Sequence, residues 1–174
     1  MADQYRKPYV DSSVFLGWKN RETINGIDRY AVFQHIWELA EARQFKIYTS
    51  AITFAEVYKL RHQAHPQPVT TVAELLKDFE RDFVESIEVD REIGFHANLL
   101  CRVHAADKLY PNDAIHLACA LRAKCDVLLA WDRPLNSITH ADIRIEEPQI
   151  IGQMKMIKLA EQPEIRPAND KTSE

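Results

Sequence analysis

The chain has 174 residues, of which 46% are hydrophobic and 28% charged, and its net charge is −4. This length and composition are typical of one soluble globular domain whose core is large enough to fold without disulfides or a structural metal. The negative charge excludes a protein that holds nucleic acid through an overall basic surface. Contact with nucleic acid would need local basic groups or metal ions to offset the acidic residues.

Short apolar runs, which predict strands, alternate along the sequence with segments whose apolar residues recur at helical spacing. The expected strands are Tyr9–Val10 and residues 46–50, 86–90, 126–131 and 143–148. A helix is expected to begin near Asp11, and further helices are expected at residues 30–43, 53–63, 71–84, 91–108, 111–124 and 148–162. Strands separated by helices predict an α/β domain with a parallel sheet.

We expect one domain over residues 1–150, followed at 151–174 by the end of the closing helix and a loose polar tail. The three cysteines have no zinc-like CxxC spacing and are expected to be free thiols. The first ten residues contain no apolar region of a signal peptide, and no apolar stretch approaches the ~20 residues of a membrane span. These features predict a cytoplasmic protein with no membrane partner.

Four acidic residues lie where an α/β sheet places functional groups. Asp11 follows the first expected strand, and Asp132 follows the strand expected at 126–131. In open parallel sheets, ligands bind beyond the carboxyl ends of the strands. Glu56 lies in an expected helix, and Asp113 lies in the first turn of another. The acids are therefore candidates for one shared site.

Each acid also has a structural explanation. Asp11 suits a helix N-cap, and Glu56 with Thr53 matches a capping box. Asp113 suits the positive end of a helix dipole, and Asp132 suits a turn. Convergence of all four without a cation would cost stability through mutual repulsion, which argues against a purely structural cluster.

The order of these acids resembles the PIN-domain nuclease family, and in particular its VapC-like toxin ribonucleases. The segments that carry the resemblance are "YVDSSVFL" (9–16), "SAITFAEV" (50–57), "PNDAIHLACAL" (111–121) and "VLLAWDRPL" (127–135). Together they span roughly residues 8–148. The resemblance implies a PIN-like three-layer α/β/α fold with a short parallel β-sheet flanked by helices.

The resemblance also implies the site. Its catalytic and metal-binding acids, with one supporting residue, are Asp11, Glu56, Asp113, Asp132 and Ser12. Arg133, beside the last acid, is expected to support contact with substrate phosphate. Carboxylates suit hard divalent ions, so the expected cofactor is Mg²⁺ or Mn²⁺. The implied activity is an endoribonuclease acting on RNA, as a homodimer and as the toxin partner of a small antitoxin protein.

Two departures from the family pattern keep other functions open. Ala130 stands where a Thr-x-Asp pattern has its hydroxyl, and no acid occurs in the four residues after Asp132. Both departures predict weaker occupancy of a second metal position. The alternatives are a PIN-like RNA-processing nuclease without an antitoxin and a low-activity PIN-like binding module.

Other classes with acids at strand ends are disfavoured. A phospho-aspartate receiver needs an acidic pair after its first strand, and a haloacid-dehalogenase-like phosphatase needs D-x-D, whereas D-S-S stands here. The four glycines form neither GxGxxG nor a Walker pattern, so a phosphate-binding glycine loop is not expected.

A few further side chains have two interpretations each. His116, one helical turn after Asp113, lies either in the site or in the core. Apolar residues of the early helices, either Phe33 and Trp37 or Val57 and Leu60, are core residues or an apolar anchoring surface for the antitoxin.

Overall fold

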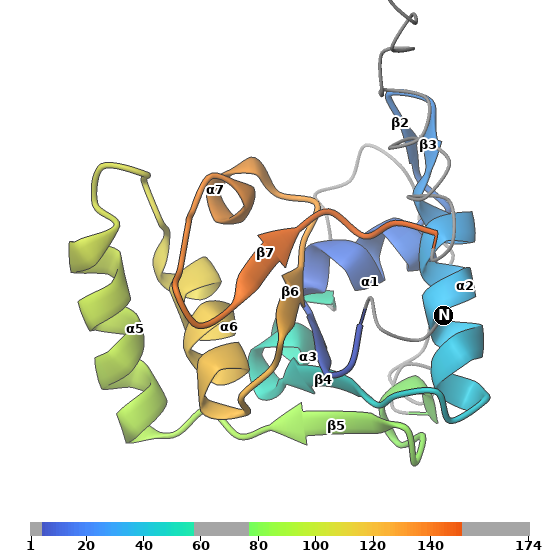
Figure 1. Ribbon diagram of the computed structural model, residues 1–174, viewed down its shortest axis with the longest axis horizontal. Coiled ribbons are helices and arrows are strands. Elements are labelled where there is room, and N and C mark those ends of the chain that lie inside the picture. The colour runs from blue at the N-terminus through green and yellow to red at the C-terminus, as the bar shows by residue number, and fades with distance from the viewer. Residues whose placement is uncertain (1–4, 58–76, 151–174) are drawn as a thin grey trace, which may run out of the picture.

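The computed structural model describes residues 5–57 and 77–150. A five-stranded sheet lies between helices (Figure 1). The larger elements are β1 (Pro8–Val10), α1 (Ser12–Lys19), α2 (Arg29–Glu41), β4 (Ile47–Ser50), α3 (Ala51–Val57), β5 (Val84–Ile87), α5 (Arg91–Val103), α6 (Pro111–Arg122), β6 (Val127–Leu129), α7 (Arg133–Asn136) and β7 (Arg144–Glu146). The strand order is β5-β4-β1-β6-β7 and every pair is parallel. The predicted α/β class is confirmed.

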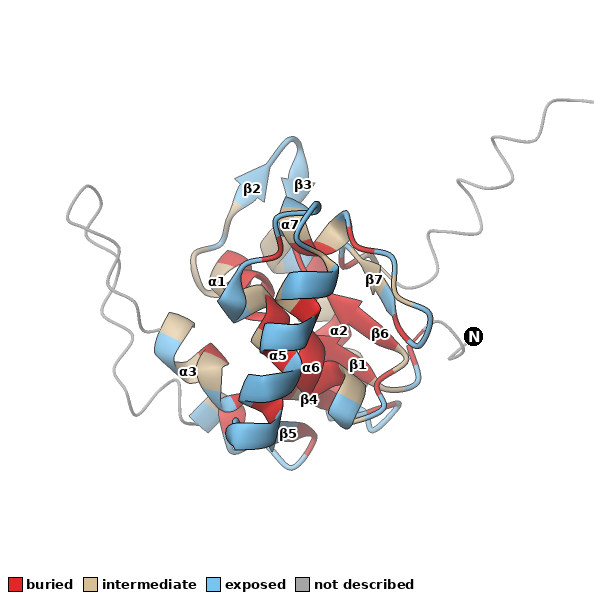
Figure 2. Ribbon diagram, turned by 90° about the vertical axis from the view of Figure 1, so that its left-hand side faces the viewer, coloured by how far each residue is buried: buried red, intermediate tan, exposed pale blue. Residues whose placement is uncertain are grey.

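Successive strand residues pack on opposite faces of this sheet, as the period of two requires. Val10 and Leu129 are partners in register and belong to the core under α1 and α2. Tyr9 and Leu128 are also partners and belong to the core under α5 and α6. Figure 2 shows α5 and α6 over this second face, with buried strands behind them. Helices on both faces confirm the predicted three-layer arrangement.

The central strand β1 determines where the chain changes direction. From β1 the chain passes outward to β4 and β5, then returns to β6 and β7 on the other side of β1. Open α/β sheets bind ligands at such a switch point, beyond the carboxyl ends of the strands. The backbone N–H of Asp11 donates to Leu129 O at 3.1 Å, so the ends of β1 and β6 meet there.

The core under α1 and α2 is aromatic. Phe33 is fully buried, with ring centroids 5.1 Å from Phe15 and 5.3 Å from Trp18. Trp18 stacks on Trp37 at 4.9 Å. Phe33 and Trp37 are therefore core residues, and the interpretation of them as an antitoxin-anchoring surface is wrong, because binding a partner there would require opening the core.

Some predicted boundaries differ from the structure. The strand expected at 86–90 is β5, which begins at Val84, so the helix expected at 71–84 ends before that residue. Residues 58–76 of the two helices expected in that region lie outside the described residues, as do 151–174 with most of the closing helix and the polar tail.

A hairpin between α1 and α2 was not predicted. It consists of β2 (Thr23–Ile24) and β3 (Ile27–Asp28), joined by Asn25 and Gly26, whose φ values are 54° and 79°. Positive φ at both loop residues suits the tight hairpin turn that Asn-Gly favours. The Asn25-Gly26 dipeptide was the sequence signal from which this hairpin could have been predicted.

The three cysteines are free, as expected. Within residues 5–57 and 77–150, no helix has the length and apolar character that crossing a bilayer requires.

Candidate active site

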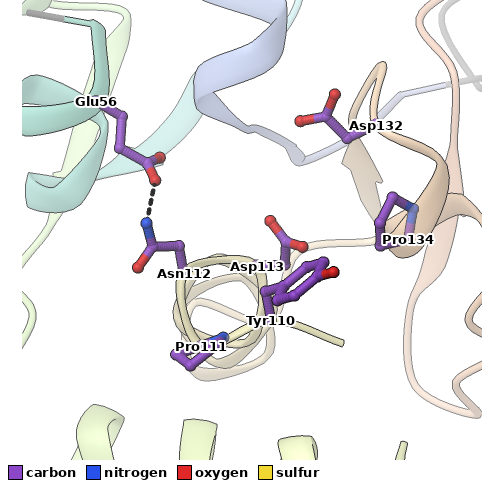
Figure 3. Close-up of a pocket in the computed structure, with 7 residues that line it drawn as sticks. All are labelled: Glu56, Tyr110, Pro111, Asn112, Asp113, Asp132 and Pro134. Carbon is purple, nitrogen blue, oxygen red and sulfur yellow. Dashed lines mark hydrogen bonds between the residues drawn. The ribbon is translucent and has the colours of Figure 1, made fainter. Parts of the chain in front are cut away.

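The four predicted acids come from four different elements at the carboxyl edge of the sheet. Asp11 directly follows β1, Glu56 lies in α3, Asp113 lies in the first turn of α6, and Asp132 separates β6 from α7. Three of the carboxyl groups surround a cavity of about 590 Å³, which is shown in Figure 3 and lined by Glu56, Tyr110, Pro111, Asn112, Asp113, Asp132 and Pro134. The fold thus brings together residues up to 121 positions apart in sequence, from Asp11 to Asp132.

Asp11 is both a helix cap and a member of the cluster. Its Oδ1 accepts from the backbone N–H of Ser13 at 2.6 Å and from the Ser13 hydroxyl at 2.5 Å. Burial raises the pKa of Asp11, and the charge of Asp132 raises it further, while His116 and Ser13 oppose the shift. The two interpretations of Asp11 are therefore compatible, because the cap uses one oxygen.

Asp113 carries the clearest effect of crowding. Partial burial, together with the charges of Asp11 and Asp132, raises the pKa of Asp113 to about 6. The pKa of Asp132 is also raised, first by partial burial and then by Glu56, although the positive charge of Arg29 opposes it. The carboxylates are therefore close enough to influence one another's pKa.

Glu56 does not form the expected capping box. Helix α3 begins at Ala51, so Thr53 lies inside the helix, where its hydroxyl bonds Thr49 at 2.8 Å. The carboxylate of Glu56 instead accepts hydrogen bonds from three donors: Ser12 Oγ at 2.6 Å, Asn112 Nδ2 at 2.7 Å (Figure 3) and His116 Nε2 at 2.9 Å. Burial alone would raise the pKa of Glu56, but these donors lower it to about 2. Glu56 therefore stays ionised.

His116 lies in the core and reaches the site from there. The side chain is 1% exposed, and its Nδ1 is 2.9 Å from the hydroxyl of Tyr9, which donates to Ser50 Oγ at 2.7 Å. Burial opposes protonation of the ring, but the hydrogen bond to Glu56 and nearby acids raise the pKa of His116 overall. Both interpretations of His116 thus hold at once.

Arg29 is a basic residue that acts on the cluster and that sequence reasoning missed. Arg29, at the start of α2, pairs with Glu22 at 3.1 Å and lies 4.8 Å from the ring centroid of Trp131. Its charge is the largest influence that lowers the pKa of Asp132. Arg133 is exposed on the first turn of α7, and its contact with substrate remains a prediction.

Asn112 and Ser13 were also missed. Asn112 precedes Asp113 and lies one turn before His116, and this i, i+4 spacing, which places both donors on one helical face, was the available signal. Ser13 gave no such signal, because its hydroxyl links Asp11 to the backbone N–H of Trp131, which is 118 residues away.

The donor set suits a hydrated hard cation. All four acids offer carboxylate oxygens, the ligands that Mg²⁺ and Mn²⁺ prefer. In the part of the chain that the structure describes, no group of three or more His, Cys, Asp or Glu side chains converges at ligand distance on one point. Mg²⁺ usually takes one or two carboxylates and keeps several waters, so the spread acids and open cavity fit such an ion.

The raised pKa of Asp113 predicts a pH-dependent stability cost. The folded chain holds the Asp113 proton up to about pH 6, whereas the ordinary pKa is 3.8, so folding loses stability as pH rises through this interval. Asp113→Asn should therefore raise the melting temperature at pH 7.5, without divalent ions, by about 2–4 °C, or roughly 1 kcal/mol after allowance for solvent exposure. The gain should vanish near pH 4, which thermal unfolding by circular dichroism checks.

Glu147→Gln is the matched control, because Glu147 is an exposed acid that follows β7. Equal shifts in both variants at pH 7.5, or a gain for Asp113→Asn that persists at pH 4, would contradict the assignment of the cost to the cluster.

Comparison with known proteins identifies the family. A comparison with curated proteins gave no match. VapC20 of Mycobacterium tuberculosis, described as a sarcin–ricin loop cleaving toxin, has a similar fold, with a TM-score of 0.57, 16% identity, and coverage of 79% of this chain and 98% of its own. PAE2754 of Pyrobaculum aerophilum has a TM-score of 0.51, 19% identity, and coverage of 90% and 91%. A family model described as the PIN domain matches residues 9–140. The chain therefore belongs to the PIN domain family, a family of nucleases.

Proposed function

We propose that the chain is an endoribonuclease that hydrolyses RNA phosphodiester bonds with Mg²⁺ or Mn²⁺ at its four-acid cluster. The observation that carries the proposal is the convergence of Asp11, Asp113 and Asp132, where burial and then the charges of the other two raise the pKa of Asp113 to about 6. A site that costs stability when empty of cations suits a protein that binds one. Membership in the PIN domain family supports the same chemistry.

The carboxylates divide into two kinds. The side chains of Asp113 and Asp132 accept no hydrogen bond from the described residues, and that of Asp11 uses only Oδ1, so each of these carboxylates has an oxygen free for a cation. Glu56 already accepts three hydrogen bonds of the roughly four that a carboxylate can accept. Glu56 is thus better suited to hold a cation through a water than by direct contact. A bound divalent ion would supply an activated water and stabilise charge on the phosphate.

Local basic groups must bring RNA to this acidic edge, because the net charge is −4. Arg29 lies near Asp132, and Arg133 is exposed directly beside it. We assign both to contact with substrate phosphate, with Ser12 in support of the site through its hydrogen bond to Glu56.

Replacing the carboxylates should abolish cleavage and leave the fold intact. Asp11→Asn and Asp113→Asn each remove a negative charge and keep the shape of the side chain. Loss of even an indirect metal contact costs about 10–100-fold in affinity or activity, so we expect at least ~100-fold slower cleavage of a fluorescent RNA in Mn²⁺ or Mg²⁺. Calorimetric Mn²⁺ binding should weaken in parallel.

Glu147→Gln should cleave as the wild type does, and a chelator should stop the wild-type reaction. Normal cleavage by both aspartate variants would place the active site elsewhere.

We further propose that the nuclease is the toxin of a toxin–antitoxin pair and acts in the cytoplasm. The fold similarity to VapC20, a toxin by its description, supports this role. An acidic site is naturally blocked by an arginine- or lysine-bearing segment, which pairs with carboxylates, so a small basic antitoxin protein suits it.

Expression of the chain alone should then arrest growth of a bacterial host, and Asp11→Asn should relieve the arrest. Culture density after induction measures this, with soluble protein quantified for both. Unaffected growth with abundant folded wild-type protein would contradict the toxin role and favour an RNA-processing nuclease without an antitoxin. Absence of both arrest and cleavage would favour a low-activity binding module.

The second copy of a homodimer has a candidate surface on α5. Phe95, Leu99 and Val103 form an apolar stripe at i, i+4 and i+8 and are 71%, 58% and 71% exposed. Figure 2 shows this outer side of α5 facing away from the sheet. Contiguous exposed apolar side chains mark protein-interaction surfaces, and these three lie on one face of the helix.

Leu99→Glu should convert a dimer to a monomer, because it places a charge in the centre of the apolar stripe. Light scattering after size exclusion measures the mass directly. Asn98→Glu is the control, since Asn98 is exposed on α5 but lies outside the stripe. A dimer that survives Leu99→Glu would exclude this surface.

A further inference from the structure

A buried chain of hydrogen bonds connects the core to the active site. Ser50, at the end of β4, accepts from the hydroxyl of Tyr9 on β1 at 2.7 Å. The same hydroxyl is 2.9 Å from His116 Nδ1, and His116 Nε2 is 2.9 Å from Glu56 Oε2. All three residues before Glu56 are buried. This series of hydrogen bonds ends on Glu56, whose carboxylate also accepts from Ser12 and Asn112.

Core packing alone does not explain a histidine at this position. Its neighbours in α6 are apolar, with Leu117 fully buried and Ala114 likewise. A buried polar ring is costly unless its nitrogens are paired, whereas a leucine would fill similar space at no such cost. The ring of His116 has a partner at each nitrogen, and one of these partners is in the cavity wall. The feature that leucine lacks is the donor toward Glu56.

Among the three donors to Glu56, His116 is the most firmly fixed. Asn112 is exposed, and the hydroxyl of Ser12 can rotate about its own bond. His116 is held at its opposite nitrogen by Tyr9, whose ring also contacts it edge-on at 5.8 Å and 67°. An imidazole held at Nδ1 can present Nε2 in only one direction, so it defines the orientation of the carboxylate that it bonds.

We infer that His116 is a positioning residue that, seated on Tyr9 and Ser50, fixes the carboxylate of Glu56 for catalysis. The inference rests on the proposed nuclease function. Glutamate has several rotatable bonds and, without this anchor, would sample orientations in which it no longer holds a cation through water. His116 itself does not touch the cavity, so it acts only through Glu56.

The test compares His116→Leu with His116→Gln. Leucine removes the donor, whereas the amide of glutamine can donate to Glu56 from a similar place. We expect His116→Leu to lower kcat about 10–100-fold, the usual range for a residue that orients a metal-site group, with KM for RNA little changed. His116→Gln should restore most of kcat. Calorimetric Mn²⁺ affinity should follow the same order.

Leu117→Val controls for a loosened α6, since it removes buried volume next to His116 without touching Glu56. It should lower the melting temperature and leave kcat unchanged. If His116→Leu fails to fold, Tyr9→Phe replaces it, because this change removes only the hydroxyl that holds Nδ1. Tyr9→Phe should lower kcat in the same direction by a smaller factor.

A double-mutant cycle with Glu56→Gln decides whether His116 acts through Glu56. In the Glu56→Gln background, His116→Leu should lower kcat by less than about 2-fold, because the carboxylate that His116 positions is already absent. Full additivity would overturn the inference, as would a His116→Leu variant that behaves like Leu117→Val.

Crystal structures separate this inference from the proposed function. In His116→Leu, the side chain of Glu56 should lose its single orientation, and an unchanged Glu56 would overturn the inference. Failure of the proposed function gives a different result: the wild type would neither bind Mn²⁺ nor cleave RNA, while Glu56 would still become disordered in His116→Leu.

Discussion

Repulsion among carboxylates is the constraint on which the rest of this structure depends. The parallel strand order brings the ends of β1, β4 and β6 together, and each is followed by an acid or by a helix that carries one. The structure relieves this repulsion unevenly. Glu56 receives three hydrogen bonds and Asp11 receives two, while Asp132 has the charge of Arg29. Asp113 accepts no side-chain hydrogen bond from the described residues, and burial with the neighbouring acids raises its pKa to about 6, although the charge of His116 opposes the shift.

The polar groups beneath the cluster explain how the sheet holds it in place. The hydroxyl of Thr49 donates to Val10 O at 2.9 Å and bonds Thr53 at 2.8 Å, so one buried residue links β1, β4 and α3. Tyr9 and Ser50 add a second link between β1 and β4 on the opposite face. Such fully paired networks are rigid, because breaking one bond leaves a buried group unsatisfied. The site is therefore fixed from below and open to solvent above.

The sequence was sufficient for the elements whose apolar pattern is strong. The fold class, α6 and the buried strand β6 follow from local periodicity, and the four acids follow from their order along the chain. The hydrogen-bond partners of these acids could not be predicted in this way, because the fold brings them together from distant parts of the sequence. Ser12 and Glu56 are 44 residues apart, and His116 and Glu56 are 60 apart. The capping box at Thr53 and Glu56 shows the converse error, in which a local pattern matched but the helix begins two residues earlier.

The residues that depart from the family pattern show how the same edge is held by other means. At position 130 alanine provides no hydroxyl, yet the hydroxyl of Ser13 donates to Asp11 and accepts from the N–H of Trp131 at 2.9 Å. The segment that leads to Asp132 is thus tied to Asp11 from α1 rather than from its own strand. Asn136 occurs where a further acid was sought, and its amide donates to Ala130 O at 3.0 Å. Asn136 stabilises the turn and adds no charge. The total negative charge of the cluster is therefore smaller than it would be with a fifth acid, and so is the repulsion at Asp113.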